Sequence, residues 1–170
     1  LSLAEVDRLN FEDYYGTIID GDSMFPVLTT ANQLQFQFPV ATSAIYGFSG
    51  ITELDELYIW EDYSNGVLTE VDGFSNLTTI NNEFYIQWTS ALSRIAGFDS
   101  LTTVGALVVG YNSNLNDLSA LSGITSMLYV DLRMTAAGSA SNVNHCDFIT
   151  LDNIGYSFEL EGMVYDENDC

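Results

Sequence analysis

A motif that recurs every 23 to 26 residues constrains this chain more than any other feature. Each copy has a small residue, an aromatic residue or leucine, two variable positions, an aliphatic residue, a threonine, one more position and a second aliphatic residue. Clear copies run over 47–54, 73–80 and 97–104; a weaker copy runs over 120–127, and an earlier copy at 25–31 lacks the glycine. A fixed period in this range predicts a solenoid, in which each coil buries its apolar residues against its neighbours.

A short run of alternating residues follows each motif. Alternation with period two is typical of strands, and it turns one residue inward and the next outward. The fifth coil fits two registers, 130–133 or 128–130, and both place the same face inside. The predicted inward pairs of the other coils are Leu34/Phe36, Leu57/Ile59, Phe84/Ile86 and Leu107/Val109.

A second apolar pair precedes the next glycine, so each coil has two or three apolar corners joined by turns. These pairs are Leu68/Val71, Leu92/Ile95 and Leu115/Leu118. Helical periodicity appears only in residues 1–10, where Leu3, Val6 and Leu9 share a face. The predicted fold is therefore mainly β: a right-handed parallel β-solenoid with about five coils.

The ends of such a stack leave strand edges that need a cap or a partner. We expect one domain over 1–170, with a cap or first coil at 1–24, repeats at 25–133 and a C-terminal cap at 134–170. Within that cap, an intrachain disulfide between Cys146 and Cys170 would pin the carboxyl end and contribute about 3 kcal/mol. Free thiols or an intermolecular pair are the alternatives. The intrachain disulfide implies an oxidising compartment.

The charge balance restricts the partners. The chain carries 24 acidic residues against three arginines, Arg8, Arg94 and Arg133, for a net charge of -21. Such a charge repels phosphate backbones and anionic lipid headgroups, so we expect no nucleic-acid partner and no membrane binding. The uncharged stretch 23–52 contains prolines and glutamines, so it predicts no membrane-inserted helix. We interpret the start at Leu1 as a mature, secreted form from which a signal peptide has been removed.

The repeats resemble the receptor L-domain family, which is related to extracellular leucine-rich repeats. Three features carry the resemblance: the Gly-Phe-x-x-Leu-Thr-x-Val elements, the Leu-x-Val/Ile strands that follow them, and the link Asn112-Ser113-Asn114-Leu115. It covers about residues 25–132. The resemblance implies a solenoid with parallel sheets on its faces, outside the cell or at its surface, that binds proteins or supports the cell surface. Animal receptors of this family have many cysteines and a cysteine-rich module, so growth-factor binding is not implied.

The outward residues of the main sheet are the candidate binding surface. If the inward pairs are correct, Tyr58 and Tyr85 stack as neighbours with Gln35 and Val108 on either side, about 4.8 Å apart. Exposed aromatic side chains give large contact areas at low entropic cost. The alternative interpretation is that aromatic residues simply favour strands and lie beneath a loop. The predicted surface comprises Gln35, Gln37, Tyr58, Trp60, Tyr85, Gln87 and Tyr129.

Other candidate sites are weaker. The acidic clusters at Asp20/Asp22 and Asp166/Asp169 are candidate calcium ligands, but neither has the spacing of a known calcium loop. A solvated acidic face is therefore the preferred interpretation. We expect no cofactor. Asn76 begins a glycosylation sequon that coincides with the repeat motif. His145 and Cys146 are adjacent in sequence and make a poor catalytic dyad.

The sequence favours a non-catalytic structural or adhesive module, extracellular or at the cell surface, that binds a protein or copies of itself, including as a filament subunit. A soluble domain that recognises a glycan or a protein is the first alternative. An enzyme acting on polysaccharides is the second, because paired carboxylates on a solenoid can hydrolyse sugars.

Overall fold

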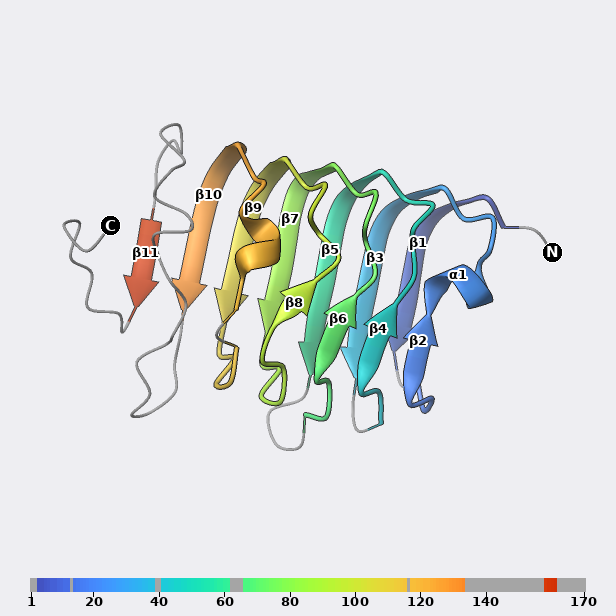
Figure 1. Cartoon of the computed structure of the whole chain (residues 1–170), viewed down its shortest axis with the longest axis horizontal. Helices are drawn as coiled ribbons and strands as arrows, with labels where there is room; N and C mark the ends of the chain where they lie inside the picture. Colours follow the sequence, from blue (N-terminus) through green and yellow to red (C-terminus); the bar gives the residue numbers. More distant parts are fainter. Residues whose placement is uncertain are drawn as a thin grey trace.

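The computed structural model describes residues 3–12, 14–38, 41–61, 66–115, 117–133 and 158–161. The coils stack along the long axis of the molecule and form two sheets of parallel strands that run along this axis (Figure 1). Successive coils contribute neighbouring strands to each sheet. The larger sheet has the order β1 (Glu5–Glu12), β3 (Thr30–Phe38), β5 (Glu53–Glu61), β7 (Thr79–Gln87), β9 (Thr103–Gly110), β10 (Ser126–Arg133) and β11 (Phe158–Glu161). The smaller sheet has the order β2 (Ile18–Asp20), β4 (Ala44–Tyr46), β6 (Glu70–Asp72) and β8 (Ile95–Ala96).

The predicted β-solenoid is therefore confirmed. Two short helical segments lie at corners of the coils: α1 (Gly21–Met24) and a 3₁₀ turn at Ser119–Leu121. Within the C-terminal cap predicted over 134–170, the structure describes β11, which pairs in parallel with β10. Cys146 and Cys170 lie outside the described residues, as does the rest of the predicted cap.

Aromatic side chains form a continuous column inside the solenoid. The rings of Phe48, Phe74 and Phe98, one from each clear copy of the motif, stack with centroid distances of 5.4 and 5.1 Å. The Phe11 and Phe36 rings stack at 5.0 Å. Each phenylalanine contacts its equivalent one coil away because neighbouring coils are spaced as neighbouring strands of a sheet. The repeat therefore becomes a ladder of like residues in the core.

The motif glycines are required where adjacent coils approach closely. Gly47 has a φ of +77°, and a Cβ there would lie 2.5 Å from the Asp22 nitrogen. A Cβ on Gly73 would lie 2.6 Å from the Gly47 carbonyl oxygen. The earliest copy also has such a glycine: Asp20 pairs with Tyr46, so Gly21 occupies the place of Gly47. The helix α1 then separates Gly21 from Phe25, which is why this copy lacks a glycine at the usual spacing.

Polar side chains join the coils at the corners. The hydroxyls of Thr78, Thr102 and Thr125 each donate to the carbonyl of the equivalent threonine one coil earlier. Asn112, which is buried, donates to the Ile86 carbonyl and accepts from the Thr89 backbone and hydroxyl at 3.0 and 2.9 Å. These bonds satisfy corner groups that a strand ladder alone leaves unpaired.

Two sequence predictions were wrong. The described part of the segment with helical periodicity is not a helix, because β1 covers Glu5–Glu12 and pairs in parallel with β3. In the fifth coil the register 130–133 is confirmed, because Val130 pairs with Leu107 and Leu132 with Val109. The alternative register 128–130 is wrong, because the Leu128 side chain is 71% exposed. Both errors have the same cause: β1 and β10 each have two successive outward residues between inward ones, which interrupts the strict alternation of a strand. In β1 these residues are Asp7 and Arg8, both exposed between Val6 and Leu9.

The first coil, which comprises the described residues before β3, exposes more apolar surface than the coils that follow. Of six large apolar side chains that are exposed among the described residues, five belong to this coil: Leu3, Tyr15, Ile18, Met24 and Val27. No preceding coil among the described residues covers them. Within the same residues, we find no helix with the length and apolar character that crossing a bilayer requires.

Candidate functional site

The outward face of β3, β5, β7 and β9 brings the predicted binding residues together. The register pairs Gln35 with Tyr58, Tyr58 with Tyr85, and Tyr85 with Val108. The next outward row pairs Gln37 with Trp60, and Trp60 with Gln87. The geometric part of the prediction, two rows of neighbours across the sheet, is confirmed.

Three of these side chains form a compact group, which we call the aromatic cluster: Tyr58, Trp60 and Tyr85. The Tyr58 and Tyr85 ring centroids lie 5.7 Å apart. The Trp60 ring meets Tyr58 and Tyr85 edge to face, at centroid distances of 6.0 and 6.3 Å. These separations lie within the favourable range for aromatic pairs. All three side chains are half-buried, so each is held in place while part of its surface remains accessible.

Hydrogen bonds fix the orientation of two hydroxyls in the cluster. The Tyr58 hydroxyl donates to the Glu83 carboxylate at 2.8 Å, and the Tyr85 hydroxyl donates to the Gln87 side-chain oxygen at 2.5 Å. Burial, the hydrogen bond to Glu83, and the negative charges of Glu83 and Glu56 together raise the pKa of Tyr58 well above its usual value. Tyr58 therefore remains a protonated donor at physiological pH, beside two carboxylates in the adjacent outward row.

The glutamines contribute less accessible surface than the aromatic residues. Gln35 and Gln87 are 7% and 6% exposed, because neighbouring side chains on the same face cover them. Gln35 also accepts a hydrogen bond from Arg8, and Gln37 is half-buried. Gln35 and Gln87 therefore support the aromatic cluster and offer little area to a partner.

Tyr129 lies apart from the aromatic cluster. It pairs with Ala106, which pairs with Glu83, so it belongs to the outward row before that of Tyr58 and Tyr85. Its hydroxyl donates to the Asp131 carboxylate at 3.3 Å. In the register of β10, Asp131 occupies the row that continues from Val108.

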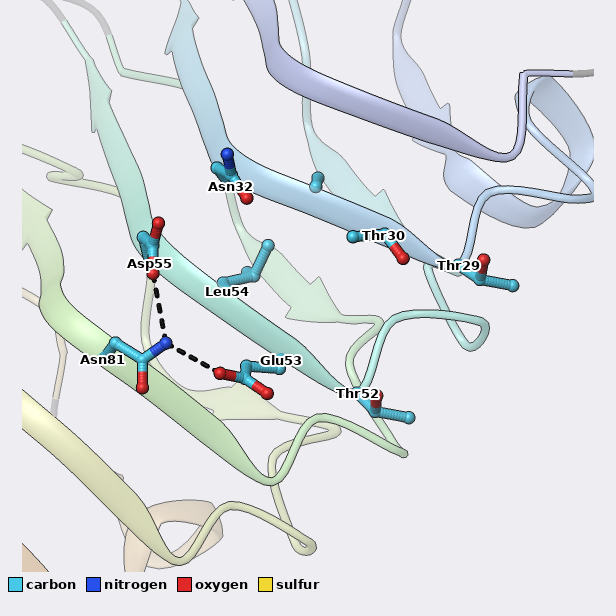
Figure 2. Close-up of a pocket in the computed structure, with 9 residues that line it drawn as sticks. Thr29, Thr30, Asn32, Thr52, Glu53, Leu54, Asp55 and Asn81 are labelled. Carbon is cyan, nitrogen blue, oxygen red and sulfur yellow. Dashed lines mark hydrogen bonds between the residues drawn. The ribbon is translucent and has the colours of Figure 1, made fainter.

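Sequence reasoning missed a polar groove at the start of these strands. The groove has a volume of about 280 Å³, and we call it the bulge groove (Figure 2). Asn81 spans it: its side-chain nitrogen donates to Glu53 at 2.8 Å and to Asp55 at 3.1 Å. The remaining lining residues are Thr29, Thr30, Ala31, Asn32, Thr52 and Leu54.

A second groove of about 330 Å³ adjoins the first and extends it toward β1. The two share Asn32 and Asp55, and the second adds Asp7, Arg8, Gln33, Glu56 and Asn82. The signal for both grooves was present in the sequence. Inward residues three or four apart, such as Leu54/Leu57 and Ile80/Phe84, leave two or three successive polar residues facing outward, at the places where the register shifts.

The candidate calcium ligands that the structure describes have other roles. Asp20 caps α1: its carboxylate accepts from the Ser23 hydroxyl and backbone, and these bonds lower the pKa of Asp20. Asp22 accepts from the Ser49 backbone at 2.9 Å and so ties α1 to the next coil. No group of three acidic, histidine or cysteine side chains among the described residues is arranged to hold a metal ion. Asp166, Asp169, His145 and Cys146 lie outside that part of the chain.

The sequon residue Asn76 is exposed at a corner between coils. Its side-chain nitrogen donates to the Ser49 carbonyl at 2.8 Å, which joins two coils as the threonine hydroxyls do. Comparison with known proteins adds no homologue on which to map these sites: no protein-family model, no curated protein and no solved structure matches this chain.

Proposed function

We propose that this chain is a non-catalytic recognition module of the structural or adhesive type, which binds a protein partner through the outward face of its larger sheet. The observation that carries the proposal is the aromatic cluster. Its three rings contact one another, and two hydroxyls are fixed by hydrogen bonds to Glu83 and Gln87. Such preorganised aromatic surfaces lose little entropy on binding and are frequent energetic centres of interfaces.

The charges around the cluster restrict the chemistry of the partner. Glu56 and Glu83 lie in the outward row adjacent to Tyr58 and Tyr85. A lysine or arginine side chain placed over Trp60 would gain from the ring and from the nearby carboxylates. A second copy of this chain supplies only three arginines against 24 acidic residues. This face therefore suits a different protein, with basic or uncharged contact residues, better than a second copy.

A glycan is the second candidate ligand, and the bulge groove favours it. The groove presents amides, carboxylates and threonine hydroxyls. Asp55 precedes Tyr58 by three residues on the same strand, so the groove and the aromatic cluster are about 10 Å apart. Sugars bind where hydrogen-bonding groups lie near an aromatic ring on which they can stack. A polysaccharide-active enzyme would use the same groove, and release of reducing sugar would reveal it.

The extracellular or cell-surface location is part of the proposal. It is supported by the resemblance of the repeats to L-domains and by the two cysteines, which suit an oxidising compartment if they are bridged.

The double variant Tyr58→Ala, Trp60→Ala tests the use of this face. The readouts are a glycan array, and retention of the labelled chain on cell-surface protein extracts at physiological salt. We expect the double variant to lose at least about tenfold in affinity for whatever the wild type binds, because truncation of aromatic interface centres costs 2 kcal/mol or more. Leu128→Ala is the matched control, since it removes an exposed apolar side chain on a different strand, β10. Unchanged binding by the double variant would refute the proposal.

A further inference from the structure

Among the described residues, no strand pairs with the outer edge of β1. β1 ends the larger sheet and pairs on one side with β3, and β2 likewise ends the smaller sheet. No other strand in the described part of the chain pairs with the outer edge of either. An open edge presents a row of backbone donors and acceptors that can pair with another strand. The exposed apolar side chains of the first coil, such as Ile18 in β2, belong to the same end of the solenoid.

Within β1, the side chains from Arg8 to Glu12 have a self-complementary order. Register with β3 places Arg8, Asn10 and Glu12 opposite three glutamines of the outward face, and Leu9 and Phe11 opposite the inward Leu34 and Phe36. The segment therefore reads cationic, apolar, amide, apolar, anionic. A second copy that runs antiparallel, with Asn10 opposite Asn10, places Arg8 opposite Glu12 twice and Leu9 opposite Phe11 twice.

The symmetry of this pairing preserves the two faces of the sheet. The twofold axis passes between the two Asn10 residues, perpendicular to the sheet, so outward residues of one copy continue as outward residues of the other. Opposite charges directly across an antiparallel pair stabilise it, whereas like charges destabilise it. Arg8 donates to Gln35 of β3, and its guanidinium has further donors for Glu12 of the second copy.

We propose that β1 is a self-association edge, through which two copies form one continuous sheet in a closed dimer. The proposal goes beyond the proposed function because it uses the end of the solenoid and leaves the aromatic cluster free for a different partner. With a net charge of -21, two copies repel wherever acidic surfaces meet. At this edge the two Arg8–Glu12 pairs offset part of the repulsion, to which Glu5 and Asp7 of β1 also contribute.

Two single charge reversals and their mixture test the proposal. In Arg8→Glu, both cross-copy pairs become carboxylate against carboxylate; in Glu12→Arg, both become arginine against arginine. We expect each variant alone to dimerise at least about tenfold more weakly than wild type in analytical ultracentrifugation. An equimolar mixture restores opposite charges at both pairs, so heterodimers should form with nearly wild-type affinity.

Two controls separate the edge from general charge effects. Asp99→Arg changes the net charge as much as Glu12→Arg, at an exposed turn away from β1, and should leave dimerisation of the chain intact. The double reversal Arg8→Glu, Glu12→Arg keeps the wild-type net charge and should dimerise as wild type, with circular dichroism confirming that each variant folds. A wild-type chain that remains monomeric across the micromolar range, or a mixture that associates no better than the single variants, overturns the proposal.

Discussion

The interior coils and the first coil have the same strand pattern but different surroundings. Strands β3, β5 and β7 have a hydrogen-bonded neighbour on both sides, whereas in the described part of the chain β1 has one on a single side. In the interior, inward residues such as Leu57 and Phe84 are fully buried, while the first coil leaves Leu9 and Phe25 only partly buried. One repeat therefore does not determine its own burial. Each coil is stable through its neighbours, and a coil at an end keeps surface that is available for contacts.

The largest expected effect is on core packing. Phe74→Ala should lower the free energy of unfolding by about 3–5 kcal/mol, because the ring is fully buried between Phe48 and Phe98. The matched change in the first coil, Phe25→Ala, should cost less than half as much, since this ring is partly exposed and meets Phe11 at the open end. Urea unfolding of both variants checks the comparison. Equal losses would mean that the first coil is packed as tightly as the interior.

The next effect concerns a polar contact between interior coils. Asn112→Ala should cost about 2–3 kcal/mol, since it leaves the buried Thr89 amide and Ile86 carbonyl without their partner. Asn114, two residues away, is exposed and makes one bond to the Ser90 carbonyl. Asn114→Ala should therefore cost at most about 1 kcal/mol. The comparison fails if the two variants unfold at the same urea concentration.

A smaller effect is expected at Glu61, an acidic residue in the interior. Glu61 is 2% exposed. One carboxylate oxygen accepts from the Val67 and Leu68 amides, while the other has no hydrogen-bond partner among the described residues. Burial raises the pKa of Glu61, although these two hydrogen bonds oppose the shift. A raised folded-state pKa means that the folded state binds the proton more tightly than the unfolded state. The contribution of this group is therefore fully present below its ordinary pKa and is lost as pH rises through the folded pKa.

Glu61→Gln should remove the loss of folding stability that Glu61 causes as the pH rises. The amide keeps an oxygen for the two backbone donors and buries no charge, so the variant should be more stable than wild type at pH 7, by about 1 kcal/mol. The difference should shrink as the pH is lowered below the folded pKa of Glu61. Thermal unfolding at several pH values measures both quantities. A variant that is less stable than wild type at pH 7 would show that the charged carboxylate is well accommodated.

Much of the solenoid was predictable, because its core repeats local patterns. The motif positions gave the inward phenylalanines and leucines, and the alternation after each motif gave the neighbours Tyr58 and Tyr85. The pairs of successive outward residues were missed for a physical reason. With two outward residues between them, Val6 and Leu9 are three apart, as on a helix face, so the strand pattern of β1 looked helical. The bulge groove was missed for the same reason, since its residues become neighbours only across strands.

The burial of Gln35 and Gln87 was not predictable from alternation. Alternation gives the side of the sheet but not the cover supplied by adjacent long side chains, here Arg8 over Gln35 and Tyr85 beside Gln87. Side-chain cover of this kind depends on which residues occupy the neighbouring coils. Which residues are neighbours across coils depends on the strand register, and the register depends on the lengths of the loops between coils.

In this structure the strands of the interior coils are paired on both edges, and β1 has an edge on which a second copy can pair. Amide hydrogen exchange of β1 and β5, measured at low and high protein concentration, tests this difference most directly. We predict that β5 amides exchange slowly at both concentrations, while β1 amides on the outer edge exchange rapidly in dilute solution and become protected as the concentration rises. Protection of β1 equal to that of β5 in dilute solution, or rapid exchange of β1 at every concentration, would contradict the account.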